Sequence, residues 1–110
     1  MTQVVPIKIV VHLYAHPGAE ALLRSFEISA ADIMGRYGGA IEHVIAPDPS
    51  LQSTEVPTEI HVVSFPDTRS FELYRDDPDL LRLAPLREQA IAKTEIFIGH
   101  DGVAYPQPSD

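Results

Sequence analysis

The chain has 110 residues, of which 45% are hydrophobic and 22% charged, with a net charge of -8. This length and composition are typical of one folded domain. Because 16 acidic residues face only 8 basic ones, with no basic stripe, we expect neither nucleic acid nor an anionic membrane surface as a partner. The sequence has no cysteine, which excludes disulfides, thiol nucleophiles and cysteine-based metal sites.

No apolar run approaches the roughly 20 residues of a membrane-spanning helix, so no such helix is expected. The first residues lack the basic and apolar regions of a signal peptide, and we therefore expect a cytoplasmic protein. We find no phosphate-binding glycine loop and no nucleotide-binding fingerprint, and therefore expect no cofactor.

The first half predicts a strand, a helix and a second strand. Ile7–Tyr14 is rich in β-branched residues, and because side chains alternate along a strand, its odd-numbered positions form an apolar face for the helices. Ala19–Tyr37 is predicted as a helix because its apolar residues follow a 3.6-residue period. These residues are Leu22, Leu23, Phe26, Ala30, Ile33, Met34 and Tyr37. A glycine pair ends the helix, and Ile41–Ala46 follows as a strand.

The second half predicts the same order of elements. Glu59–Phe65 and Thr94–Gly99 read as strands, and Pro47–Pro57 is either a tolerated surface loop or a lid over a pocket. Between the two strands, helix caps at Asp67 and Asp77 predict a broken helical region. Its expected segments are 68–75, 78–84 and 86–93. Residues 101–110 read as a tail that is either frayed or laid across a partner chain.

Together these elements predict a ferredoxin-like α+β fold, βαββαβ, over residues 1–100. Such split units give an antiparallel four-stranded sheet of order 4-1-3-2 with the helices on one face. The other face is expected to carry Val10, Val63 and Phe97, a large apolar patch that favours a homodimer with the two sheets face to face.

Several short motifs resemble an uncharacterised family of small proteins in the dimeric α/β-barrel superfamily. In the second half they are Phe65-Pro66, Tyr74 with Asp77-Pro78-Asp79, and Leu83-Ala84-Pro85-Leu86-Arg87. In the first half the segments HPGAE and RYGGAIEHV resemble the same superfamily, which includes antibiotic-biosynthesis-monooxygenase-like and muconolactone-isomerase-like proteins. The resemblance implies the fold and a homodimer that forms a barrel. It assigns no catalytic residue.

Strand alternation suggests a candidate site on the barrel side of the sheet. We expect Ile60 and Val62 to face the helices, which would turn His61 toward the barrel. In the predicted strand order, the end of the first strand meets the starts of the third and fourth. Four polar side chains would then gather at one end: His12, Tyr14, His61 and Glu95.

This group could carry proton-transfer chemistry. A histidine oriented by a carboxylate can act as general base, and Tyr14 could donate to a developing oxyanion. Two alternatives stay open: the four side chains only satisfy one another at a dimer interface, or His12, His61 and the carboxylate form a facial metal triad. We predict no metal site.

Two residues of the helical region are candidate substrate contacts. Arg87 could bind a substrate carboxylate, or it could tie a helix to an acidic partner, and Tyr74 belongs to the core or to a pocket wall. Arg69 and Arg75 are expected to be solvated. The predicted function is therefore a small-molecule enzyme, cofactor-free and monooxygenase-like or isomerase-like, with a pocket between sheet and helices that opens beside His12 and His61. The alternative is a non-catalytic dimeric module for a ligand or a structural role.

Overall fold

The computed structural model describes residues 5–108. Residues 1–4 of the expected domain and 109–110 of the expected tail lie outside the described residues. The elements in chain order are β1 (Ile7–Ala15), α1 (Glu20–Gly35), β2 (Ala40–Ile45), the 3₁₀ turn η1 (Pro49–Leu51), β3 (Glu59–Phe65), α2 (Thr68–Arg75), α3 (Pro78–Leu81), α4 (Ala84–Ala90) and β4 (Ile91–Gly99).

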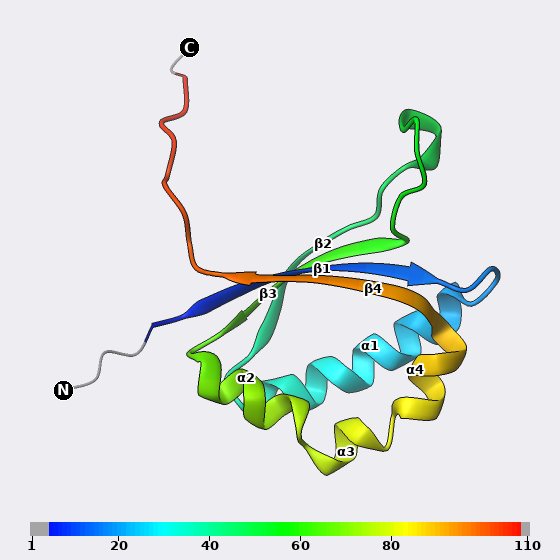
Figure 1. Ribbon diagram of the computed structural model, residues 1–110, viewed down its shortest axis with the longest axis horizontal. Helices are drawn as coiled ribbons and strands as arrows, with labels where there is room; N and C mark the ends of the chain where they lie inside the picture. The colour runs from blue at the N-terminus through cyan, green and yellow to red at the C-terminus, as the bar shows by residue number, and fades with distance from the viewer. Residues whose placement is uncertain (1–4, 109–110) are drawn as a thin grey trace.

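The four strands form one antiparallel sheet, and the helices cover one of its faces (Figure 1). The strand order is β2-β3-β1-β4. Read from the β4 edge, this is the order 4-1-3-2. The arrangement is a ferredoxin-like α+β fold, in which two β-α-β units share one sheet.

The last strand begins earlier than the sequence predicts. Residues 91–93, expected to end the last helix, belong to β4, whose first residues pair with the end of β1. A register shift between Tyr14 and Ala15 accommodates this pairing. Ile91 is buried under the helices at 8% exposure, so an apolar residue that fits a helical stripe serves here as the first residue of a strand.

The core lies between the sheet and the helices in two adjoining clusters. The first packs β1 and β3 against the end of α1 and against α2, through Ile7, Ile9, Met34, Val63, Phe65 and Phe71. The second packs the other end of β1 against α1 and α4, through Leu13, Leu23, Phe26, Ala30, Ala90 and Ile91. Between the two clusters the sheet and the helices are less tightly filled, which leaves room for the pocket described below.

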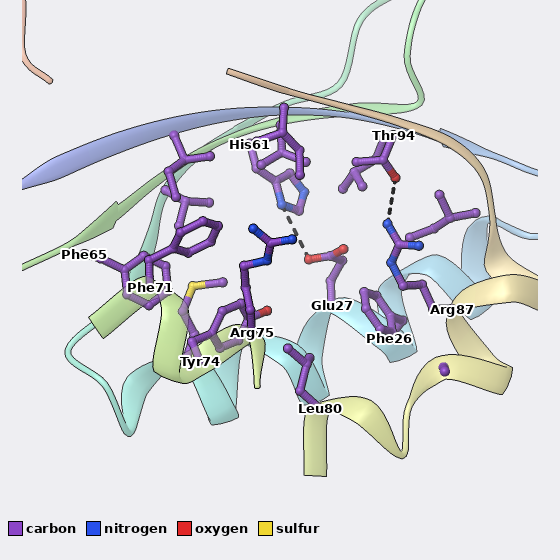
Figure 2. Close-up of a pocket in the computed structure, with 18 of the residues that line it drawn as sticks. Phe26, Glu27, His61, Phe65, Phe71, Tyr74, Arg75, Leu80, Arg87 and Thr94 are labelled. Carbon is purple, nitrogen blue, oxygen red and sulfur yellow. Dashed lines mark hydrogen bonds and ion pairs between the residues drawn. The ribbon is translucent and has the colours of Figure 1, made fainter. Parts of the chain in front are cut away.

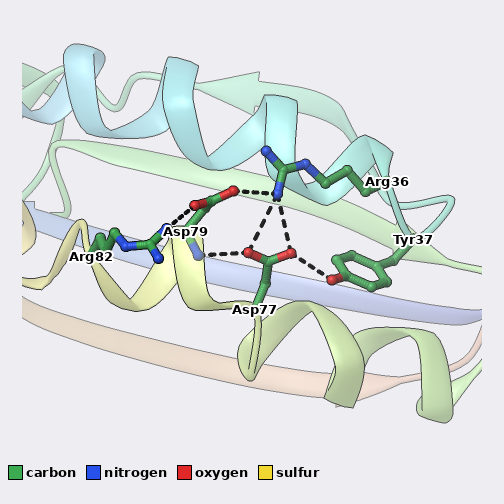
Figure 3. A network of polar contacts seen from close by, with 5 residues as sticks. All are labelled: Arg36, Tyr37, Asp77, Asp79 and Arg82. Atoms are coloured by element: carbon green, nitrogen blue, oxygen red, sulfur yellow. Dashed lines mark hydrogen bonds and ion pairs between the residues drawn. The ribbon is translucent and has the colours of Figure 1, made fainter.

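A polar network fixes the corner between α1 and the α2–α3 turn (Figure 3). Asp77 caps α3 by accepting from the backbone N–H of Asp79 at 2.7 Å, as the sequence predicts. The same carboxylate accepts from Tyr37 Oη at 2.5 Å and lies 3.3 Å from Nη1 of Arg36. Asp79 in turn pairs with Arg36 and Arg82. The end of α1 is therefore held against the turn that carries α2 and α3.

The predicted faces of β3 are wrong. In the pairing with β1, Val11 lies opposite His61 and Ile9 opposite Val63. Directly paired residues share a face, so the odd-numbered residues of β3 face the helices, and Ile60 and Val62 face the other way. Val63, expected on the uncovered face, is therefore buried at 4% exposure. The reason is that β3 has apolar residues on both faces, so alternation alone does not choose between them.

The second face of the sheet carries no covering element within residues 5–108. Phe97 stands on it with 59% of its surface exposed. The β2–β3 loop with η1, and the segment after β4, both project on this side, away from the helices (Figure 1). No helix in the described range is long and apolar enough to cross a membrane.

Candidate functional site

A cavity of about 440 Å³ lies between the helix-facing side of the sheet and the helices (Figure 2). Its volume falls within the range of small-molecule sites, about 300–1,000 Å³. Its walls are mostly apolar and aromatic, with Phe26, Phe65, Phe71 and Leu80 among them. Ile96, on the helix-facing side of β4, also lines it, yet is 51% exposed. The pocket is therefore open to solvent along the β4 side.

A histidine that lies between two carboxylates, one of them in the lining, belongs to the polar part of this pocket. Nε2 of His61 lies 2.8 Å from Oε1 of Glu59, and Nδ1 lies 3.5 Å from Oε2 of Glu27. The His61 side chain is 4% exposed and that of Glu27 16%. Since a carboxylate only accepts, Nε2 carries a proton toward Glu59, and Nδ1 faces Glu27 across a gap where one proton can be shared.

Burial shifts the pKa of Glu27 upward. The pKa is raised from the ordinary 4.5 mainly by loss of solvation, and also by the charge of Glu59, while His61 and Arg87 oppose the shift. A carboxyl whose pKa moves toward neutrality is suited to accept and return protons near neutral pH. Glu27 therefore has the electrostatics of an acid–base group.

Tyr74 and Arg87 supply hydrogen-bond donors to the same pocket. Burial, helped by the charge of Glu27, raises the pKa of Tyr74 to about 12, so its phenol keeps its proton. Within residues 5–108, no hydrogen bond engages that hydroxyl. Arg87 donates from Nη2 to Thr94 Oγ1 at 3.0 Å, so its nearest partner is a hydroxyl on β4.

The other three expected site residues lie on the opposite face of the sheet. Tyr14 Oη donates to Glu95 at 2.9 Å, and Nδ1 of His12 lies 3.4 Å from the same carboxylate. The pKa of Glu95 is lowered, first by the Tyr14 hydrogen bond. The expected group of four is thus divided, because β3 presents His61 to the helices. The two-histidine facial set is not assembled for the same reason.

Two pocket residues were missed by the sequence reasoning. Glu27 lies one turn after Leu23 and one turn before Ala30, on the buried stripe of α1 itself. A carboxylate on an otherwise apolar helix stripe is the sequence signal that would have identified Glu27. Arg75 is exposed, as expected, but it also lines the pocket, and its guanidinium lies 5.5 Å above the ring of Phe71. Arg69 is solvated as expected, with 75% exposure.

No protein-family model matches the chain, and no curated protein does. Solved structures match its fold. A protein of unknown function from Rhodopseudomonas palustris gives a TM-score of 0.80 at 13% identity, over 93% of this chain and 86% of that one. SnoaB, a cofactor-independent oxygenase from Streptomyces nogalater, gives a TM-score of 0.69 at 16% identity. The match covers 94% of this chain and 99% of SnoaB. A protein from Pseudomonas aeruginosa gives a TM-score of 0.68 at 16% identity, and the match covers 94% of this chain and 100% of that one. At these identities the likeness shows the fold alone.

Proposed function

We propose that the pocket between sheet and helices is the active site of a small-molecule enzyme that removes a proton from a carbon next to a carbonyl group. The observation that carries this is the pair His61–Glu27 in a mostly apolar cavity beside the phenol of Tyr74, with Glu59 bonded to the other ring nitrogen of His61. Buried ionisable groups reduce stability unless they are paired, and they gather where chemistry needs them.

The proposed step uses the residues as they lie. The Glu27 carboxylate takes the proton, the C–H electron pair moves onto the carbonyl, and an enolate forms. Tyr74 keeps its proton and can donate a hydrogen bond to the enolate oxygen. The new Glu27 proton can be shared with Nδ1 of His61, whose ring is oriented by the bond from Nε2 to Glu59. No bound cofactor takes part in these movements.

Two outcomes are open to such an enolate. In an isomerase-like reaction, the proton returns to a different carbon. In a monooxygenase-like reaction, the carbanion bonds to O₂, the hydroperoxide formed loses water, and a CH₂ group becomes a carbonyl. The balance is CH₂ plus O₂ to C=O plus H₂O, so the substrate itself supplies the electrons. The shared fold with SnoaB, a cofactor-independent oxygenase, supports the second outcome.

We also propose that the protein acts as a homodimer through the uncovered sheet face. Phe97 and the neighbouring apolar residues of that face support this, as do the β2–β3 loop and the segment after β4, which project on the same side (Figure 1). Exposed side chains on these projections include Leu51, Val103 and Tyr105. A second copy would cover them. The pocket lies on the far side of the sheet, so it stays accessible in this dimer.

Deuterium exchange tests the proposed proton abstraction. The protein is incubated in D₂O with aryl ketones such as 1-indanone, 2-tetralone and anthrone, and deuterium incorporation next to the carbonyl is followed by NMR. We expect the wild type to accelerate exchange in at least one ketone. Glu27→Gln should slow it by about 10²–10⁴-fold. His61→Gln should slow it and leave the dimer intact, since His61 does not lie on the uncovered face.

Tyr14→Phe is the matched control, because Tyr14 lies on the other side of the sheet. Exchange that needs Tyr14 but not Glu27 would move the site to the barrel face and contradict the proposal. A protein that accelerates exchange in none of the ketones, while binding a ligand in the pocket, would support the non-catalytic binding module.

A further inference from the structure

Two arginines point into the pocket from different helices. Figure 2 shows the guanidinium groups of Arg75, on α2, and Arg87, on α4, directed toward the sheet on either side of Glu27. Arg75 lies 5.5 Å above the ring of Phe71, and Arg87 donates one bond to Thr94. Within residues 5–108, neither guanidinium has a carboxylate within 4.0 Å. Most of their donors are therefore free to bind a ligand.

Three other arginines of the chain do have carboxylate partners. The chain has 16 acidic residues and 8 basic ones, so carboxylates are abundant. Arg36, Arg69 and Arg82 each form an ion pair. Among the residues that line the cavity, Glu27 is the one carboxylate beside these two guanidinium groups, while Glu59 lies outside the lining and is engaged by His61 at 2.8 Å. An anion is therefore the ligand that the charges favour, and a planar carboxylate matches the donor geometry of arginine.

The remaining walls suit a flat ring. The ring centroids of Phe65 and Phe71 are 5.3 Å apart, and those of Phe65 and Tyr74 are also 5.3 Å apart. All three line the cavity beside Arg75. Aromatic rings pack favourably edge to face or offset against such a surface, and the cavity of about 440 Å³ can hold a ligand of two to three fused rings.

We infer that the ligand of this pocket is a flat aromatic carboxylate, with its ring against Phe65, Phe71 and Tyr74 and its carboxylate between Arg75 and Arg87. This inference rests on the proposed function and names the substrate class of the same site. The bound ligand then lies beside Glu27, whose side chain is drawn between the two arginines (Figure 2).

Binding of such an anion would also change the acid–base group. The charge of Arg87 lowers the pKa of Glu27, and a bound carboxylate would offset that charge. The pKa of Glu27 should therefore rise further on binding, and the complex should take up protons from the buffer. At pH values above this raised pKa Glu27 stays ionised, and its carboxylate is then a stronger base in the complex than in the free protein.

Calorimetry with two matched probes tests the inference. The probes are 1-naphthoate and its neutral analogue 1-naphthalenemethanol, titrated into the wild-type protein and into three variants. We expect the carboxylate to bind at least about tenfold more tightly than the alcohol, since hydrogen bonds to charged groups are the strong ones. Arg75→Gln and Arg87→Gln should each remove most of that preference. Arg69→Gln, on the same helix as Arg75 but outside the pocket lining, should keep it.

The outcomes separate this inference from the proposed function. Equal binding of both probes, no binding of 1-naphthoate, or a preference that survives both pocket variants would overturn the inference, even if ketone exchange depends on Glu27. Arginine-dependent binding of 1-naphthoate without any ketone exchange would support the inference and count against the enzymatic step. Heat measured in buffers of different ionisation enthalpy gives the proton uptake, which should vanish in Glu27→Gln.

Discussion

Replacing Glu27 by Gln should make the protein more stable at neutral pH, which is the opposite of what removal of an ion pair normally does. The Glu27 side chain is 16% exposed, and burial raises its pKa above 4.5. A carboxyl whose folded-state pKa is raised binds more protons in the folded state than in the unfolded state. The free energy of unfolding therefore falls as pH rises from the unfolded to the folded pKa, and the loss is complete above the folded pKa.

The size of the effect follows from the partners that remain. His61 keeps its contact with Glu59 at 2.8 Å, so the substitution does not leave the buried ring without a carboxylate partner. The desolvation of Glu27 is partly offset by His61 and Arg87, so the net gain is expected to be modest. Removal of a destabilised functional group commonly raises stability by about 0.5–2 kcal/mol. With a urea m-value of about 1–3 kcal/mol/M, a gain of about 1 kcal/mol moves the midpoint by roughly 0.3–1 M.

Urea unfolding at pH 8 and at pH 4 measures this effect. Glu27→Gln should unfold at higher urea than the wild type at pH 8, and the two proteins should converge at pH 4, below the ordinary carboxyl value of 4.5. Glu72→Gln, at an exposed position on α2, should change stability by no more than about 0.5 kcal/mol at either pH. A Glu27→Gln protein that is less stable than wild type at pH 8 by more than about 1 kcal/mol would show that Glu27 is a structural ion-pair partner.

Three further predictions concern the fold and the dimer. Gly39→Ala should lower the free energy of unfolding by about 1–3 kcal/mol in urea titrations, because the added carbon overlaps two core side chains, whereas Gly35→Ala meets open space and should cost nothing. The Asp77 carboxylate, whose pKa is lowered first by the Tyr37 hydrogen bond, stabilises the fold above its ordinary 3.8 and loses this effect as pH falls through its folded pKa. Tyr37→Phe raises that folded pKa, so acid unfolding followed by circular dichroism should begin at a higher pH than in the wild type. Phe97→Lys places a charge on the uncovered sheet face and should convert a dimer to monomers in sedimentation velocity, and an unchanged dimer would contradict the proposed interface.

The helices and strands could be predicted because their local signals agree with the tertiary structure. The apolar stripe of α1 is buried from Leu23 to Met34, and Asp67 and Asp77 cap the helices that follow them. The faces of β1 were also predictable, since Ile7 and Leu13 belong to a uniformly apolar face and the other face is mixed. In α1 and in β1 the apolar residues lie on one side only, so only one orientation of the element buries them.

The face of β3 could not be predicted from alternation, and this error divided the expected site. Ile60 and Val62 are as apolar as Val63 and Phe65, so either face of this strand could have met the helices. The face of β3 that meets the helices is set by its register with β1, which is a pairing between distant parts of the chain. His61 then joins the pocket, and the pocket also contains Arg87 and Tyr74, which the sequence reasoning named separately.

Glu27 was missed for a different reason. A charged residue on a helix is normally assigned to the solvated face, and neither neighbour of Glu27 in the sequence marks it as special. Glu27 is a candidate site residue because it lies beside His61, 34 positions later in the chain, and because it falls on the helix stripe whose other residues pack against the sheet. A rule that every ionisable residue falling on an apolar helix stripe is a candidate site residue would have selected Glu27 from the sequence alone.

A crystal structure of the protein saturated with 1-naphthoate tests the central claim most directly. The account predicts ligand density in the cavity between sheet and helices, with the ring against Phe71, the carboxylate at Arg75 and Arg87, and Glu27 within reach of the ring. Density on the uncovered face beside His12, with the cavity closed by its own side chains, would contradict the account and return the site to the other side of the sheet.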